Sequence, residues 1–237
     1  MTFDQLRNMP VFTRANYYEA MRQEANKASL AGLSYALSKQ IVDNNIIHIG
    51  RDQYSFSQGK HAYRHTYSET SERIASEMTE EYPSGNFQIF ELVQLNAFLN
   101  HQIAHNTIFV FVENELVDYV FDMLKMKHPG KVLLKPSVED YYKYYVDDLI
   151  VVLRLPSESP KEAGCNWHSR LEKILVDISV DKLVSKLVSR GEYPLIFNDA
   201  FSRYAIDTKA MLRYANRRGA AARFKAMLGQ YAPSKDL

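Results

Sequence analysis

The sequence predicts an α+β protein, and three observations lead to this fold class. Residues 1–56 contain three helical patterns followed by a hairpin pattern. Residues 66–155 alternate apolar strand patterns with helices, which predicts a mixed sheet, and residues 168–228 keep only the helical period. We therefore expect an N-terminal domain at 1–58 and a mixed α/β domain with a helical last third at 66–237.

The composition is that of a folded protein without disulfide bonds. Of its 237 residues, 46% are hydrophobic and 24% are charged, which is ordinary for globular domains. The single cysteine, Cys165, excludes an intrachain disulfide and suits a reducing compartment. No apolar run approaches the roughly 18 residues of a membrane span, and the N-terminus lacks a signal-peptide core. We expect a cytoplasmic protein with no membrane partner.

The net charge of +1 hides a segregation of charge along the chain. Residues 1–60 carry seven Lys or Arg against five Asp or Glu, whereas residues 61–160 carry eight against fifteen. Residues 161–237 carry fourteen against eight. Two basic ends around an acidic middle create local fields that favour an anionic partner, although solvated faces explain any single segment equally well.

Helix-breaking and capping residues delimit the first two predicted helices. Pro10 ends the first, Phe3–Met9, because proline cannot continue a helix interior. Thr13 is a suitable N-cap for the second, Arg14–Ala25.

A third helix, Leu30–Asp43, leads into a tight hairpin. Ser29 is its predicted N-cap. Its apolar stripe consists of Leu30, Leu33, Leu37 and Ile41. Two strands, Ile46–Ile49 and Gln53–Phe56, flank the turn-forming residues 50–52.

A helix with a polar outer face, followed at once by a basic-tipped hairpin, matches the outline of a winged helix-turn-helix. Three short amphipathic helices also occur in many other folds. If the motif is present, the candidate DNA-binding residues are Ser29, Tyr35, Ser38, Lys39, Arg51 and Gln53. Lys39 and Arg51 would meet phosphates, and the uncharged side chains would read base edges. This surface is sparsely basic, so useful affinity would require a dimer or a second basic patch.

The middle of the chain supplies the sheet. The predicted strands are Phe87–Leu92, Thr107–Glu113, Val132–Leu134 and Leu149–Leu155. The predicted helices are Thr66–Tyr82, Leu95–Leu99, Glu115–Lys127 and Val138–Tyr145. We expect a loop at Pro156–Trp167. We interpret Ser57–His65 as a solvated linker, in preference to a metal site built on His61 and His65.

The last third is predicted to be helical. Within residues 168–188, Leu171 and Leu175 fall on an inward stripe, and Glu172 and Lys173 point elsewhere. Three further helices follow, at Tyr193–Tyr204, Thr208–Arg218 and Ala220–Leu228. Several arginines lie near the end of the second of these: Arg213, Arg217, Arg218 and Arg223. They form either a solvated face near a helix C-terminus or a surface for an anionic partner.

Motifs for catalysis are scarce. The sequence contains neither a glycine-rich phosphate loop nor a Gly-x-Ser-x-Gly elbow. The strongest enzymatic candidate is a magnesium nuclease site with Glu91 and Glu113 at strand ends, near Lys125 or Lys127. The acid-x-Lys pattern expected beside them is missing. We expect no enzyme, no catalytic residues, no metal and no cofactor; a metal-dependent nuclease and a ligand-sensing winged-helix regulator remain the alternatives.

The order and spacing of these segments resemble a known family. The Leu-Glu-Lys-x-Leu-Val-Asp run at 171–177 and the Met-Leu-Arg-Tyr-Ala segment at 211–215 follow an N-terminal hairpin unit. This combination resembles the AbiEi-like antitoxins of type IV, abortive-infection toxin–antitoxin systems, over residues 2–228.

The resemblance implies a winged helix that binds operator DNA and represses its own operon. It also implies a C-terminal domain that counteracts a nucleotidyltransferase-like toxin, and the family brings no agreed catalytic residues. On this reading, the basic residues expected at the antitoxin surface are Lys173, Arg213, Arg217 and Arg218.

Overall fold

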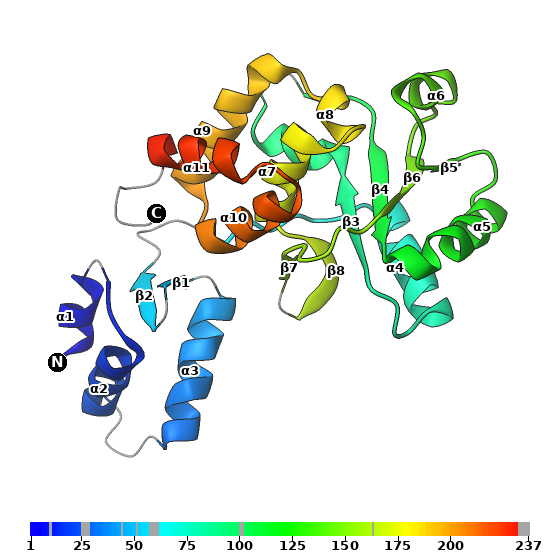
Figure 1. The fold of residues 1–237 in the computed structure, drawn as a ribbon. Helices are drawn as coiled ribbons and strands as arrows, with labels where there is room; N and C mark the ends of the chain where they lie inside the picture. Colours follow the sequence, from blue (N-terminus) through cyan, green and yellow to red (C-terminus); the bar gives the residue numbers. More distant parts are fainter. Residues whose placement is uncertain are drawn as a thin grey trace.

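A computed structural model describes residues 1–231, except residues 10, 25–28, 44, 51, 57–61, 100–101 and 163. Within this part, the protein is a mixed α+β fold with a six-stranded mixed sheet and a separate two-stranded sheet (Figure 1). The prediction of an α+β protein built on a mixed sheet is confirmed.

The first 56 residues form three helices and a hairpin, as predicted. The elements are α1 (Phe3–Arg7), α2 (Arg14–Glu24), α3 (Leu30–Val42), β1 (Ile46–Gly50) and β2 (Gln53–Phe56). They enclose a hydrophobic cluster of their own, made of Leu6, Phe12, Tyr17, Ala20, Leu37, Ile46 and Tyr54. The clusters beneath the large sheet are made of other residues.

The start of α3 follows its predicted cap, but its apolar stripe is shorter than predicted. The Ser29 hydroxyl accepts a hydrogen bond from the Gly32 N–H at 3.1 Å. Leu33 and Leu37 are buried, whereas Leu30 is 63% exposed. The prediction of Leu30 as a core residue is wrong, because the first turn of α3 borders an open groove beside α2 instead of the core.

A pairing that the sequence pattern missed ties the segment before α2 to the hairpin. Phe12 and Tyr54 exchange two backbone hydrogen bonds of 2.8 Å, so Phe12 extends the edge of β2. Their rings also stack, with centroids 6.0 Å apart. This contact fixes the hairpin against the helices.

The large sheet has the strand order β5-β6-β4-β3-β8-β7. Its strands are β3 (Phe87–Glu91), β4 (Thr107–Val112), β5 (Val132–Leu134), β6 (Leu149–Arg154), β7 (Lys161–Glu162) and β8 (Cys165–Ser169). β4, β5 and β6 are parallel, β3 is antiparallel to β4, and β8 pairs in parallel with β3. The predicted loop at Pro156–Trp167 is wrong in its second half, since this region contains β7 and most of β8.

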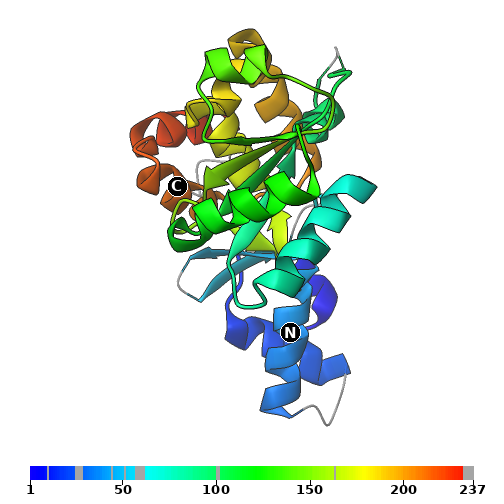
Figure 2. The ribbon, with the colours of Figure 1, turned by 90° about the vertical axis from the view of Figure 1, so that its right-hand side faces the viewer.

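Helices cover both faces of this sheet, and the alternation along β4 shows how (Figures 1 and 2). Ile108, Val110 and Val112 pack in the cluster beneath α4 (Glu69–Glu81) and α5 (Val117–Lys127). Phe109 and Phe111 point the other way, into the cluster shared with the C-terminal helices. Because β4 is buried on both faces, its sequence is a continuous apolar run.

The opposite layer begins with α7 (Leu171–Val180), which packs against α8 (Val184–Leu187) and α10 (Thr208–Arg217). The remaining helices are α6 (Val138–Lys143), α9 (Tyr193–Arg203) and α11 (Ala221–Tyr231), with short 3₁₀ turns at Leu92–Ala97, Asn114–Leu116 and Arg190–Glu192. The helical pattern expected over 168–188 begins only at Leu171, because His168 and Ser169 belong to β8, and it is interrupted at Asp181. Its carboxylate accepts the N–H groups of Leu183 and Val184. Among the described helices, none has the length and apolar character needed to cross a membrane.

Candidate functional site

The outer face of α3 is the first candidate surface. Tyr35 is 72% exposed, and Ser38 and Lys39 are exposed on the same side of the helix. Ser29 lies at the helix start with its hydroxyl engaged in capping. Gln53 is exposed on β2, and Arg51 lies outside the described residues. Three of the six predicted DNA-binding residues therefore share one open helix face.

Arg14 adds a cation at the hairpin that the sequence pattern did not single out. Its backbone N–H donates to Asp52 Oδ1 at 3.3 Å, and its guanidinium donates to the Tyr54 hydroxyl at 3.2 Å. The hydrogen bond to Tyr54 raises the pKa of Arg14 further, with Asp52 contributing. Asp52 itself occupies the left-handed region at the turn, with φ of 54°. Helix α2 thus presents its first residue beside the hairpin.

Lys173 does not lie on a surface. Its side chain is 1% exposed, and Nζ lies 2.6 Å from Asp177 Oδ2 and 3.2 Å from the centroid of the Phe111 ring. Burial lowers the pKa of Lys173, and the carboxylate of Asp177 opposes that shift. The prediction of Lys173 in an exposed antitoxin surface is wrong, because α7 is covered by the sheet on one side and by helices on the other.

Asp177 is the centre of a buried polar network. It also accepts a hydrogen bond from the Tyr214 hydroxyl at 2.8 Å, and Arg218 Nη2 approaches it at 3.7 Å. Arg218 pairs more closely with Asp181, at 2.9 Å. The Leu-Glu-Lys-x-Leu-Val-Asp run therefore joins α7 to α10 inside the protein.

The other three predicted antitoxin residues lie on and after α10. Arg213 and Arg217 are exposed, one helical turn apart, and Arg218 is half-buried by its ion pairs. The Arg217 Nε–H donates to the Ser157 hydroxyl. Arg217 and Arg218 border the same surface groove, and Arg213 is not among the residues that line it.

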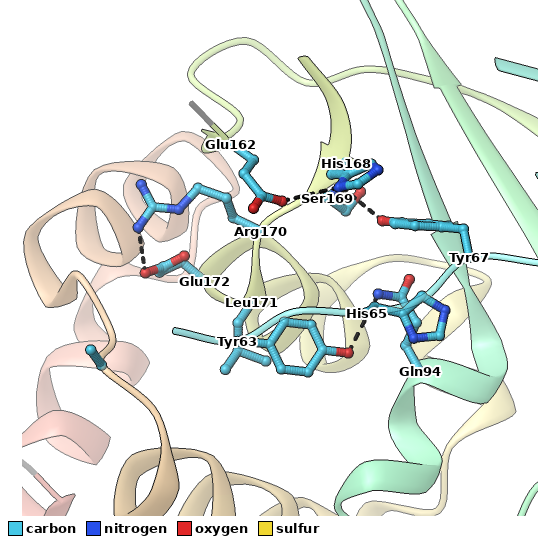
Figure 3. Close-up of a pocket in the computed structure, with 11 residues that line it drawn as sticks. Tyr63, His65, Tyr67, Gln94, Glu162, His168, Ser169, Arg170, Leu171 and Glu172 are labelled. Carbon is cyan, nitrogen blue, oxygen red and sulfur yellow. Dashed lines mark hydrogen bonds and ion pairs between the residues drawn. The ribbon is translucent and has the colours of Figure 1, made fainter. Parts of the chain in front are cut away.

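A small polar cavity lies where the segment before α4 meets β8 and the start of α7 (Figure 3). Its lining consists of Tyr63, His65, Tyr67, Gln94, Glu162, His168, Ser169, Arg170, Leu171, Glu172 and Ala205. Its volume of about 40 Å³ has room for about three water molecules, at about 10–15 Å³ each. Tyr63 and His65, at the described end of the predicted linker, line this site, whereas Arg64 between them is exposed. The interpretation of the linker as solvated is therefore wrong for Tyr63 and His65 and agrees with the exposed side chain of Arg64.

Glu91 does not line the cavity but binds His65, which does. It is 1% exposed and accepts hydrogen bonds from His65 Nε2 at 2.7 Å, from Ser71 Oγ at 2.7 Å and from Asn106 Nδ2 at 3.3 Å. The Ser68 hydroxyl is a further partner. Burial raises the pKa of Glu91, but the hydrogen bonds from His65, Ser68 and Ser71 together hold it below its ordinary value.

Two further pairs close the cavity. His168 Nδ1 lies 3.2 Å from Glu162 Oε2, and Arg170 Nη2 donates to Glu172 Oε1 at 2.8 Å (Figure 3). The Ser169 hydroxyl is buried and has no partner among the described residues. Each acidic or basic side chain of the lining thus pairs with another titratable side chain. The small cavity is therefore a polar contact between elements and not an open reaction site.

The structure places the two carboxylates of the nuclease alternative far apart. In the β3–β4 register, Glu91 is opposite Ile108, whereas Glu113 follows Val112 at the other end of β4. With a rise of about 3.4 Å per residue, the two carboxylates are separated by the length of the strand pair, on the order of 15 Å. They cannot share one metal ion. In the described ranges, no group of three or more His, Cys, Asp and Glu side chains is arranged to hold a metal.

These features define a mixed α+β protein with a three-helix and hairpin unit, a helix-covered mixed sheet and a buried ionic network on α7. The chain belongs to a family of unknown function, DUF6577, whose model matches residues 32–234. The match begins within α3 and includes the hairpin, the sheet and the C-terminal helices. No curated protein matches the chain.

Proposed function

We propose that this protein is a DNA-binding antitoxin of a type IV toxin–antitoxin system. The observation that carries the DNA-binding half is the open, polar face of α3, joined directly to a hairpin on a core of its own. That arrangement is compatible with a winged helix-turn-helix, in which the third helix enters the major groove and the hairpin flanks it.

The α3 face has the composition of a groove-reading helix with few phosphate contacts. Lys39 would meet the backbone, and Tyr35 and Ser38 would face base edges. Arg14 lies at the hairpin side, but its guanidinium already pairs with Asp52 at 3.9 Å, so the free positive charge of this surface stays sparse. Two helix-hairpin units on a palindromic operator would double this modest contact set.

The antitoxin half rests on the sequence resemblance at 171–182 and 211–219. With Lys173 in the core, the exposed residues left for a partner are Arg213 and Arg217, with Arg218 beside them. Paired arginines one turn apart suit carboxylates on an acidic protein surface. The proposed partner is the adjacent nucleotidyltransferase-like toxin, and the proposal assigns no catalytic step to this chain.

Fluorescence anisotropy on the full chain tests the DNA-binding half. The protein is titrated onto its own upstream DNA and onto a shuffled duplex across a salt series. We expect preference for the upstream DNA, and a salt slope about 0.9 shallower in Lys39→Ala, as for one lost phosphate contact. Lys127→Ala, an exposed lysine on α5, is the matched control and keeps the full slope. Equal, weak binding to both duplexes would remove this half of the proposal.

Growth rescue tests the other half. The neighbouring nucleotidyltransferase-like gene is expressed with and without this chain, beside an Arg213→Ala/Arg217→Ala variant. Rescue by the wild type and its loss in the variant are expected. A non-toxic neighbour, or rescue that is unchanged by the variant, contradicts the proposed surface.

A further inference from the structure

A groove at one edge of the large sheet shares Arg217 and Arg218 with the proposed antitoxin surface, but its other lining residues have no role in the proposed function. It lies where β5 and β6 end, and its volume of about 740 Å³ falls in the range of small-molecule sites, about 300–1,000 Å³. Its walls are the turn after β5, the end of β6, the link from α7 to α8 and the end of α10.

The topology explains why a ligand site belongs at this edge. β5 and β6 are parallel neighbours, so their carboxyl ends open on the same side of the sheet. Lys135 follows the last residue of β5, and Arg154 is the last residue of β6. In open sheets with parallel strands, ligands bind in the crevice outside these strand ends.

The groove carries an excess of positive charge. Its lining includes five cations, Lys135, Arg154, Lys182, Arg217 and Arg218, and one acid, Asp181. Asp181 is already paired with Arg218 at 2.9 Å. Within the described residues, the other four cations lie in no ion pair.

The positive charge of the groove is larger than the negative charge of the helix C-termini beside it. α7 and α10 both end at this groove, and each C-terminus contributes about half a negative charge. Together they offset about one of the four unpaired cations. The remaining charge, gathered in a concave site, focuses a field that attracts polyanions.

One wall of the groove is apolar. Leu153, Val180 and Leu183 line it, together with Pro136 and Pro156. A surface that combines clustered arginines and lysines with an apolar wall suits a ligand with phosphates at one end and a flat ring at the other. Phosphate groups match the fork of an arginine, and an aromatic base buries its face against aliphatic side chains.

We propose that this groove binds a nucleoside polyphosphate. The exposed cations Lys135, Arg154, Lys182 and Arg217 hold the phosphates, and the apolar wall holds the base. The site lies in the sheet unit and does not depend on the DNA-binding face of α3. It shares Arg217 with the proposed antitoxin surface, and the nucleotide contacts of Lys135, Arg154 and Lys182 do not require the antitoxin role.

Isothermal titration calorimetry on the full chain tests this site, with ATP, GTP and inorganic triphosphate as probes. We expect one nucleotide per chain and at least tenfold weaker binding of inorganic triphosphate, because it lacks the ring. The double variant Arg154→Ala/Lys182→Ala is expected to lose at least tenfold in nucleotide affinity. Both side chains are exposed, so the variant keeps the melting temperature of the wild type.

Lys209→Ala/Lys225→Ala is the control, since it removes the same charge from exposed positions on α10 and α11 outside the groove. Its affinity should equal that of the wild type. The proposal is overturned by an absence of binding to ATP and GTP, by equal losses in the two double variants, or by triphosphate that binds as tightly as the nucleotides. A single-stranded oligonucleotide that binds the groove while mononucleotides do not would also overturn it.

Discussion

Lys173 and Asp177 form an ion pair of 2.6 Å whose side chains are 1% and 2% exposed. They lie one turn apart on α7, and the Lys173 ammonium lies over the ring of Phe111. A second pair with the same spacing and distance, Asp199 and Arg203 on α9, is partly exposed, at 35% and 49%. The two pairs allow the effect of burial to be separated from that of geometry.

Asp177→Asn should be strongly destabilising, because it leaves the Lys173 ammonium buried without its carboxylate. Breaking a buried pair from one side costs about 3–5 kcal/mol. Asp199→Asn, in the exposed pair, should cost about 1 kcal/mol or less. Urea unfolding followed by circular dichroism gives both values. Similar losses in the two variants would mean that the α7 pair is as well solvated as the α9 pair.

Glu91 should make the stability of the protein depend on pH. Its folded-state pKa lies below the ordinary value of 4.5, so its contribution is complete above about pH 4.5. That contribution is lost as the pH falls through the depressed folded pKa. Glu91→Gln should therefore destabilise the protein most at neutral pH, and the difference from the wild type should shrink in acid. Denaturant unfolding between pH 7 and pH 3 measures it, and a constant difference would contradict this role.

Two buried serines near the cavity should respond differently to alanine. Ser71 donates to the Glu91 carboxylate at 2.7 Å, and loss of a hydrogen bond to a charged group costs about 1.5–3 kcal/mol. The Ser169 hydroxyl has no partner in the described structure, so Ser169→Ala should change the stability by less than about 1 kcal/mol. Thermal melting of the two variants measures both losses. A larger loss for Ser169→Ala than for Ser71→Ala would mean that the Ser169 hydroxyl has a hydrogen-bond partner that the described residues do not show.

The corrected core face of α3 can be checked by paired truncations. Leu37 is 3% exposed within the N-terminal cluster, and Leu37→Ala should cost about 2–5 kcal/mol. Leu30→Ala should be nearly neutral, because Leu30 is mostly in solvent. Hydrogen exchange of the α1–α3 amides reports the difference locally. An equal loss of amide protection in the two variants would mean that Leu30 also packs in the core.

The sequence predicted several helices and strands well, because the apolar pattern of each is set by local burial. The predicted strand Val132–Leu134 coincides with β5, and the run from Thr107 was recognised as a buried strand because both of its faces are covered. The predicted helix over 30–43 differs from α3 by one residue. The division of the chain into two domains, at 1–58 and 66–237, stays a prediction.

The sequence did not predict features that depend on contacts between residues far apart in the chain. β8 joins the sheet through a single parallel pairing of His168 with Ile89, and its short polar sequence shows no strand period. α7 looked amphipathic, yet residues 171–178 are all buried, since its charged positions pair inside the protein. The cavity collects side chains from Tyr63 to Ala205, and no local pattern links such distant positions.

The borders of the large sheet limit how this protein can meet others. The edge strands are only three residues long at β5 and two at β7. Such short borders offer few unpaired backbone groups to an incoming strand. A partner chain therefore has little main chain on which to dock and must be recognised through side chains, which ties its specificity to residues that can change without disturbing the sheet.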